Sequence, residues 1–251
     1  MKHIHSINNP LVKQWKRLLT KKERDKSGLF LVEGFHLVEE ALNQREQLLE
    51  IILSERVELP ARWDIGSIPV TTITEEITNE LSDTETTQGI YAVCRQEGKR
   101  TLQEAKTFLL IDAVQDPGNL GTMIRTADAA GIDAVIVGNG SVDIFNAKVV
   151  RSAQGSHFHL PLLKGNLNEW IEDLKKENIP VYGTALENAK VYTKTLPTSR
   201  FALIVGNEGK GVEKELLDKT TANLYIPIFG KSESLNVAVA TGILLYYLRS
   251  V

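Results

Sequence analysis

Short apolar runs alternate with helical patterns through the second half of this chain. Residues 107–114 form a nearly continuous apolar run, as expected for a strand that is covered on both faces. Residues 120–130 have helical spacing and stop at Gly131, a residue type that commonly follows a helix end. This alternation predicts an α/β domain with a mostly parallel sheet and helices on both of its faces.

The rest of this half follows the same alternation. We expect further strands at 134–137, 158–160, 181–184, 202–206 and 224–228, and helices at 145–153, 167–177 and from Ser234 or Leu235 to Tyr247. The polar stretch 96–104 has no sustained apolar period and predicts a linker. It would separate a domain at 1–95 from a domain at 105–251.

The first half predicts a smaller α/β layer without an obvious catalytic constellation. Asn9 and Pro10 begin a helical pattern, because proline fits the first turn of a helix. Further strands are expected at 29–32, 49–53, 68–70 and 89–94, and helices at 34–43 and 75–81.

The composition is that of an ordinary globular protein. The chain has 251 residues, of which 42% are hydrophobic and 24% charged, enough for one large domain or two modest ones. No run of 18 apolar residues predicts a membrane span, and the first residues lack the apolar segment of a secretory signal. Cys94 is the only cysteine, which excludes an internal disulfide and favours a reducing, cytoplasmic location.

Positive charge is concentrated at the N-terminus. Residues 1–26 contain eight Lys and Arg residues against two acidic residues, a net charge of +6, although the whole chain carries −3. Such a segment can bind a polyanion such as RNA, or it can be a solvated helix face. The charge pattern alone leaves both readings open.

Three blocks of small and polar residues lie where strands give way to loops or helices: 116–128, 204–213 and 226–240. Ligands of open α/β folds bind at the carboxyl ends of the strands, so the three blocks predict one composite site. In the second block, Gly206, Gly209 and Gly211 allow close approach of a ligand to the backbone. Their spacing matches neither a dinucleotide fingerprint nor a phosphate-binding P-loop, which disfavours an NAD or ATP site.

The other two blocks each begin a helix. Asn119 stands at the start of the first helix, where Asn is commonly a cap, and Arg125 would offer a permanently charged fork for phosphate or carboxylate. Ser234 is expected to cap the last helix, and the small residues Ala238, Ala240 and Gly242 would permit close packing.

Other candidate sites are less specific. His157 and His159 have no further ligands nearby at metal spacing and are interpreted as ordinary sheet residues. Cys94 is expected to be a buried structural thiol, and no Ser–His–Asp grouping is evident.

Together the blocks resemble the three motifs of the SpoU (TrmH-like) family of RNA ribose methyltransferases, in the SPOUT superfamily. The resemblance covers 116–131, 203–213 and 226–242 in the family's order, and 151–161 is similar to a family segment between the first two motifs. Residues 30–42 resemble the family's N-terminal substrate-binding domain, so the similarity spans nearly the whole chain.

The resemblance implies a C-terminal α/β domain with a deep trefoil knot, which strand alternation would not have suggested because knots are rare. It implies that S-adenosylmethionine binds in the knot without a metal. The residues that would line or adjoin the cofactor are Gly206, Ile226, Leu235, Thr184, Leu186 and Asn207.

The resemblance also implies 2′-O-methylation of RNA, with ribosomal RNA favoured over transfer RNA. The family's active-site residues map onto Asn119, Arg125, Glu208, Ser234 and Asn236. A homodimer through the knotted domain is implied, and RNA is expected to contact Lys13, Lys16, Arg17, Lys21, Lys22, Arg24 and Arg151. The alternatives are a non-catalytic knotted RNA-binding homologue and a nucleotide-dependent oxidoreductase.

Overall fold

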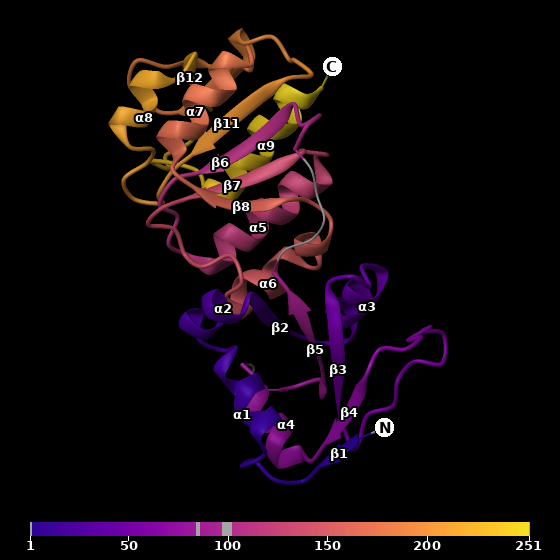
Figure 1. Cartoon of the computed structure of the whole chain (residues 1–251). Coiled ribbons are helices and arrows are strands. Elements are labelled where there is room, and N and C mark those ends of the chain that lie inside the picture. The colour runs from indigo at the N-terminus through magenta and orange to yellow at the C-terminus, as the bar shows by residue number, and fades with distance from the viewer. Residues whose placement is uncertain (1, 84–85, 97–101, 251) are drawn as a thin grey trace. The chain divides into compact units, whose positions relative to one another are not determined.

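The computed structural model describes residues 2–83, 86–96 and 102–250, which form two compact units (Figure 1). Unit 1 comprises Met1–Lys99 and Phe145–Phe158, and unit 2 comprises Arg100–Ile144 and His159–Val251. The predicted boundaries place 145–158 in the second domain, whereas this segment packs with unit 1. Residues 97–101 of the predicted linker lie outside the described residues.

Unit 1 is built on a five-stranded sheet in the order β1-β4-β3-β5-β2. Its strands are β1 (Lys2–Ile4), β2 (Leu29–Glu33), β3 (Leu48–Ser54), β4 (Val70–Ile73) and β5 (Ile90–Arg95). β4 pairs in parallel with β1 and β3, while β5 is antiparallel to β2 and β3. Three strands, β2, β3 and β5, fall close to the predicted ranges.

Four helices from the first half of the chain belong to unit 1: α1 (Pro10–Arg17), α2 (Lys21–Ser27), α3 (Phe35–Asn43) and α4 (Glu75–Leu81). The Asn9 side chain caps α1 by accepting from the backbone N of Leu11, and Pro10 takes the first helical position. Val12 and Trp15 of α1 are buried in the core with Ile77 of α4. The N-terminal segment is therefore part of the folded core of unit 1.

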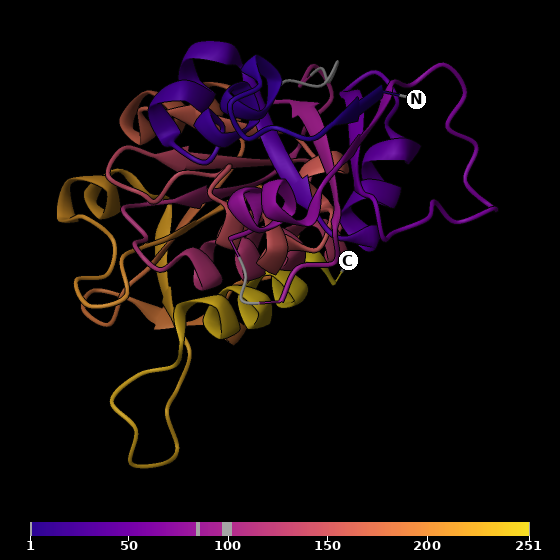
Figure 2. The same ribbon diagram turned by 90° about the horizontal axis from the view of Figure 1, so that it is seen from below.

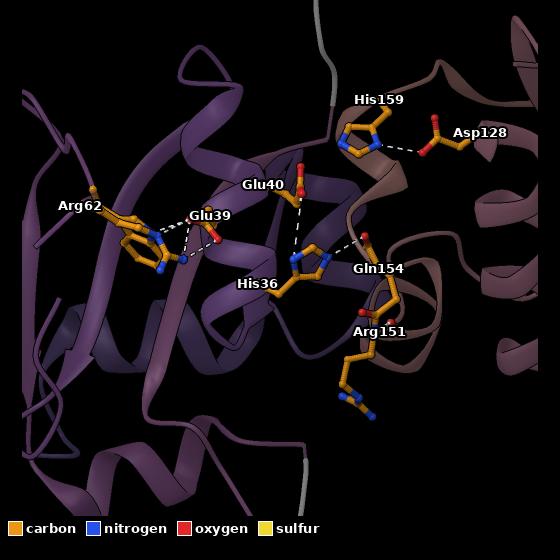
Figure 3. Close-up of polar contacts among 9 residues, drawn as sticks. His36, Glu39, Glu40, Arg62, Asp128, Arg151, Gln154 and His159 are labelled. Carbon is orange, nitrogen blue, oxygen red and sulfur yellow. Dashed lines mark hydrogen bonds and ion pairs between the residues drawn. The ribbon is translucent and has the colours of Figure 1, made fainter. Parts of the chain in front are cut away.

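The segment 145–158 contributes α6 (Ala147–Ala153) and the 3₁₀ turn η1 (Ser156–Phe158) to unit 1. The ring of Phe30 on β2 lies 4.7 Å from that of Phe145 and 6.0 Å from that of Phe158. His36 of α3 places Nε2 3.1 Å from the carbonyl oxygen of Gln154 (Figure 3). Gly155 has φ +94°, and a Cβ there would lie 2.6 Å from Cγ of Glu40. Aromatic packing and close backbone approach thus hold this segment in unit 1.

Unit 2 contains a seven-stranded sheet in the order β10-β12-β9-β11-β6-β7-β8, and every strand pair in it is parallel. The strands are β6 (Thr107–Ile111), β7 (Ala134–Gly138), β8 (Leu162–Gly165), β9 (Val181–Thr184), β10 (Lys190–Val191), β11 (Phe201–Val205) and β12 (Ala222–Tyr225). The central strands β6, β7 and β11 are buried along their whole length. This confirms the α/β fold with a mostly parallel sheet.

Helices cover both faces of this sheet (Figure 1). α7 (Leu167–Lys176) and α8 (Lys214–Lys219) pack on the face that carries Phe108, Ile136 and Ile204. Side chains alternate between faces along a strand, so Leu109 and Leu203 point to the opposite face. There α5 (Pro117–Ala129) and α9 (Val237–Arg249) pack against each other, α5 also contacting β7 and α9 also contacting β11.

One predicted strand is wrong. Residues 158–160 were expected to form it, but Ser156–Phe158 is a 3₁₀ turn and the strand begins at Leu162. Phe158 and Leu160 are buried, so the apolar pattern correctly indicated that these side chains lie in the core. Gly155 turns the chain just before this segment, and its left-handed φ is not visible in an apolar pattern.

Candidate active site

The loops that follow β6 and β11 meet at the centre of the unit 2 sheet. β6 pairs with β11 on one side and with β7 on the other, so the order of strands along the chain reverses there. In open α/β sheets, the crevice outside the carboxyl ends of strands at such a point binds ligands. The first two predicted motifs lie in the segments that follow the carboxyl ends of β6 and β11, at this point of the sheet.

The loop after β11 is closed tightly on itself. Asn207 and Gly211 exchange two backbone hydrogen bonds of 3.0 and 2.9 Å. The Oδ1 atom of Asn207 accepts from the backbone N of Gly209 and of Lys210, both at 3.0 Å, and its Nδ2 donates to the carbonyl of Ala113 at 2.8 Å. The Asn207 side chain therefore shapes the loop and fastens it to the loop after β6.

Gly206 is the point of closest approach in this loop. A Cβ at this position would lie 2.2 Å from the backbone C of Gly211 and from the backbone N of Val212. No side chain fits in that space, so the glycine is required by packing.

Glu208 joins the two loops through its carboxylate. Oε1 accepts from the backbone N of Asp116 at 3.0 Å and from Nδ2 of Asn119 at 3.1 Å, and Oε2 accepts from the backbone N of Gln115 at 3.2 Å. Partial burial acts to raise the pKa of Glu208, but these hydrogen bonds outweigh it and hold the pKa below the ordinary value. The carboxylate therefore stays charged at neutral pH. Its contribution to stability is present above the ordinary glutamate pKa and is lost as the pH falls through the lowered pKa.

A chain of side-chain hydrogen bonds links all three motifs. Nδ2 of Asn236 donates to Oδ1 of Asn119 at 2.9 Å, and Asn119 in turn donates to Glu208. Asp116 caps α5 by accepting from the backbone N of Asn119 at 2.7 Å. The Asn119 amide is therefore not used as the cap, and its side chain joins Asn236 to Glu208.

Asn236, and not Ser234, caps the last helix. Its Oδ1 accepts from the backbone N of Ala238 at 2.9 Å and of Val239 at 3.3 Å, and α9 begins at Val237. The predicted start at Ser234 or Leu235 is wrong, because sequence alone cannot rank two residues that both make good caps. Ser234 lies in the exposed loop, where its carbonyl accepts from Oγ of Ser232.

These two roles of Asn236 can be separated by substitution. Asn236→Ala should lower the free energy of unfolding by about 1 kcal/mol, the usual cost of a lost cap. Asn236→Ser should keep the cap and the melting temperature but lose the donor to Asn119. We expect both variants to be slow in the methyl transfer that the family resemblance implies, measured alongside thermal melts. A wild-type rate for Asn236→Ser would show that the bond to Asn119 is dispensable.

Arg125 lies on the same helix as Asn119, with its side chain exposed between the buried residues Ile124 and Ala127. Within residues 2–83, 86–96 and 102–250, no hydrogen bond or ion pair engages its guanidinium. A free guanidinium on the helix that carries Asn119 can bind an anionic ligand bidentately.

Three of the predicted cofactor residues lie at the carboxyl ends of neighbouring strands. β9 lies between β12 and β11, so their carboxyl ends are neighbours. Thr184 ends β9 and donates to the carbonyl of Ile204 at 3.1 Å, Gly206 follows β11, and Ile226 follows β12. Leu186 is 77% exposed and Leu235 38% exposed. Apolar Leu186, two residues after β9, and the close-approaching backbone after β11 suit a small, partly apolar cofactor.

The connection between β12 and α9 extends away from the strands and helices of unit 2 (Figure 2). Along 228–231, no backbone group is hydrogen-bonded to another described residue. Backbone groups of this kind are satisfied by water or by a ligand. The backbone of this connection is therefore open to a ligand.

The residues expected to contact RNA fall into two groups. Lys13, Arg17, Lys21 and Lys22 are exposed on α1 and α2. The other three are engaged within unit 1: Lys16 pairs with Glu80, Arg151 donates to Asp83 at 3.1 Å, and Arg24 is 4% exposed and donates to the carbonyl of Leu18 at 2.8 Å. Arg24 is therefore a core residue, and its guanidinium is not available to contact RNA.

Three residues of the loop after β6 belong to this site but were not singled out from the sequence. The Gln115 amide donates to the carbonyls of Ala113 and Gly140, and the carboxylate of buried Asp112 accepts from the backbone N of Glu213 at 2.8 Å. Ala113 has φ +52°, an uncommon conformation that stores strain at functional sites. Their position just after a buried strand was the signal that could have identified them.

The two histidines singled out in the sequence lie in different surroundings. His157 packs against Phe30 and Phe145 of unit 1, and His159 of unit 2 places Nδ1 2.8 Å from the Asp128 carboxylate (Figure 3). Among the described residues, no group of three or more His, Cys, Asp or Glu side chains could hold a metal ion. In the same part of the chain, every helix is too short or too polar to span a bilayer.

Comparison with known families shows matches over both halves of the chain. Residues 106–246 match the model of the SpoU rRNA Methylase family, and residues 9–92 match that of the MRM3-like substrate binding domain. The chain is 53% identical over 249 residues to the 23S rRNA (guanosine(2553)-2'-O)-methyltransferase RlmP of Bacillus subtilis, covering 99% of this chain and 100% of that protein.

Solved structures of methyltransferases have a similar fold. The chain is similar to an AdoMet-bound rRNA methyltransferase from Sinorhizobium meliloti, with a TM-score of 0.87, 32% identity and coverage of 99% of this chain and 97% of that one. It is also similar to the SpoU methyltransferase AviRb from Streptomyces viridochromogenes in complex with AdoMet, with a TM-score of 0.85, 26% identity and coverage of 97% and 98%.

Proposed function

The chain belongs to the SpoU rRNA methylase family, and we therefore propose that it transfers a methyl group from S-adenosylmethionine to a ribose 2′-hydroxyl of ribosomal RNA. The B. subtilis relative acts on a guanosine of 23S rRNA, so 23S rRNA is the proposed substrate. The observation that carries the proposal is the hydrogen-bonded chain Asn236–Asn119–Glu208, which joins the three motifs at the carboxyl edge of the sheet.

The cofactor, when bound, supplies an electrophilic methyl group. The protein's own residues must place the 2′-oxygen in line with it, and positioning of this kind can lower a barrier by roughly 7–11 kcal/mol. Asn119, Asn236, Ser234 and Glu208 would orient ribose, cofactor and loops. Arg125 would clamp a substrate phosphate and stabilise the negative charge that develops on the oxygen. Because arginine stays protonated, the hydroxyl proton would leave to phosphate or water.

Unit 1 supplies the proposed RNA-binding surface. Exposed Lys13, Arg17, Lys21 and Lys22 lie on α1 and α2, in the region that matches a substrate binding domain. Deleting residues 1–26 would remove Val12 and Trp15 from the core and unfold unit 1, so charge removal is the sharper test.

Arg17→Gln with Lys21→Gln should weaken RNA binding and reduce the slope of log affinity against log salt by about 0.7–0.9 per lost phosphate contact. The matched control is Lys175→Gln with Lys176→Gln on α7 of unit 2, which removes the same charge far along the chain. Binding titrations across salt concentrations make the comparison. Equal slopes for the two double variants would assign the basic residues to a solvated helix face.

We propose that the protein forms a homodimer through α9. Val239, Ile243 and Tyr246 are 53%, 37% and 55% exposed and lie at helical spacing on one face. Covering such a stripe is favourable in proportion to the apolar area removed from water. Ile243→Glu should yield a monomer by light scattering, whereas Ile7→Glu, at an equally exposed residue of unit 1, should not change the mass.

Two further features are proposed on the family's pattern: a trefoil knot in the C-terminal part of unit 2, and a cytoplasmic location, where ribosomal RNA is found. The domain assignment also remains a proposal, with unit 1 gripping RNA and unit 2 carrying out methyl transfer.

Mass-spectrometric mapping of 2′-O-methyl nucleosides in 23S rRNA tests the function directly. Cells that lack the protein should lose one methylated guanosine, and the purified protein should restore it in vitro. Calorimetry with S-adenosylmethionine and NADH separates the alternatives. Binding of NADH alone would favour an oxidoreductase, and RNA binding without any methyl transfer would favour a non-catalytic homologue.

A further inference from the structure

Phe229 is 97% exposed, the highest exposure among the large hydrophobic side chains of the described residues. It lies in the connection between β12 and α9 that extends from unit 2 (Figure 2). Burying a phenylalanine side chain contributes about 1.5–3 kcal/mol relative to leaving it in water. An aromatic ring held in solvent at this place is therefore available to stack on a ligand.

The ring is close in sequence to the proposed active site. Ser234 and Asn236 follow Phe229 by five and seven residues, and Asn236 is hydrogen-bonded to Asn119. Seven residues span at most about 25 Å when fully extended. Phe229 therefore lies no more than about 25 Å along the chain from the residue that joins this network.

Each of the three motifs carries one exposed basic side chain without an ion pair among the described residues: Arg125, Lys210 and Lys231. Lys231 lies two positions after Phe229, separated only by Gly230, beside which a Cβ would meet no atom within 4 Å. An aromatic ring next to an unpaired cation offers a face for a base and a charge for its phosphate.

We propose that Phe229 stacks on a nucleobase next to the methylated ribose while Lys231 binds the adjoining phosphate. This rests on the proposed function. Charge favours a nucleotide over the cofactor as the occupant: a phosphate is an anion, whereas S-adenosylmethionine carries a sulfonium and an ammonium against one carboxylate and so has the same net sign as Lys231. A second copy of the chain would be expected on the apolar stripe of α9 instead, because polar residues 230–234 separate Phe229 from that stripe.

The test measures RNA binding, cofactor binding and oligomeric state of Phe229→Ala, Phe229→Trp and the control Leu196→Ala. Leu196 is 84% exposed in unit 2 and outside the motifs, so it matches Phe229 in exposure. The RNA is a 23S fragment with 2-aminopurine beside the target guanosine, whose fluorescence is quenched by stacking. We expect Phe229→Ala to bind it roughly 5- to 150-fold more weakly and to lose the quenching, the range for one lost base–aromatic stack.

Phe229→Trp and Leu196→Ala should bind and quench like the wild type. Weaker S-adenosylmethionine binding by Phe229→Ala with unchanged RNA binding would make the ring a cofactor contact and overturn the proposal. A monomeric Phe229→Ala would make it a subunit contact, with the same consequence, and unchanged quenching would show that nothing stacks there. Methyl transfer by the wild type is measured in parallel: its absence refutes the proposed function, whereas normal transfer with unchanged quenching refutes only the role of Phe229.

Discussion

Arg125→Ala is expected to abolish methyl transfer and to leave S-adenosylmethionine binding near the wild-type level. Removing a single donor that stabilises developing negative charge typically costs about 10²–10³ in rate, and a charged bidentate donor that also positions the phosphate should cost at least as much. The side chain is exposed and makes no contact that the fold depends on, so the variant should fold normally. Single-turnover methyl incorporation and calorimetry measure the two effects separately.

Arg125→Lys is the informative companion, because it keeps the charge and loses the planar fork. We expect partial activity, with RNA binding retained better than turnover. Wild-type turnover of Arg125→Ala would remove Arg125 from the mechanism. Loss of cofactor binding in that variant would instead move it to the cofactor site.

Gly206→Ala should remove both cofactor binding and turnover. The added Cβ would lie 2.2 Å from the backbone of Gly211 and Val212, so the loop must open. Opening would break the paired hydrogen bonds between Asn207 and Gly211 and would carry Glu208 away from Asn119. Overpacking of this kind usually costs about 1–3 kcal/mol of stability, so a lower melting temperature should accompany the loss of function.

Gly209→Ala is the matched control within the same loop. A Cβ on Gly209 has only Oδ1 of Asn207 within 4 Å, at 3.8 Å, which is an ordinary contact. This variant should bind S-adenosylmethionine and melt like the wild type. If Gly206→Ala behaved like Gly209→Ala, the loop would be able to yield, and the close approach at Gly206 would not be needed for the site.

Periodicity and residue type predicted the parts of the fold that depend on local properties. The apolar run at 107–114 became β6, and Asn9 with Pro10 began α1. The rule that ligands bind at the carboxyl ends of strands predicted that the three motifs form one site. Where two local signals competed, sequence was insufficient: Ser234 and Asn236 are both good caps, and the contact between Asn236 and Asn119, 117 residues apart, is seen only in the folded chain.

Charge was the least reliable predictor of RNA contacts, because the type of a charged residue does not reveal which partner it has in the folded chain. Arg24 was grouped with the exposed basic residues, but it lies in the core of unit 1 with its guanidinium on the Leu18 carbonyl. Arg151 similarly donates to Asp83. The sequence placed segment 145–158 with the second half of the chain, whereas it packs in unit 1, because the aromatic contacts of Phe30 with Phe145 and Phe158 join residues more than 100 positions apart.

The amino-acid sequence by itself determined the class of fold, the three motifs and the residues available for chemistry, because apolar periodicity and glycine placement act over a few neighbouring positions. The tertiary structure alone decided which of those residues meet. Strand order placed the loop after β11 beside the loop after β6, and only there can Glu208 accept hydrogen bonds from Gln115, Asp116 and Asn119. The physical reason is that hydrogen bonds and close packing act at about 3 Å, and folding brings distant residues within that range.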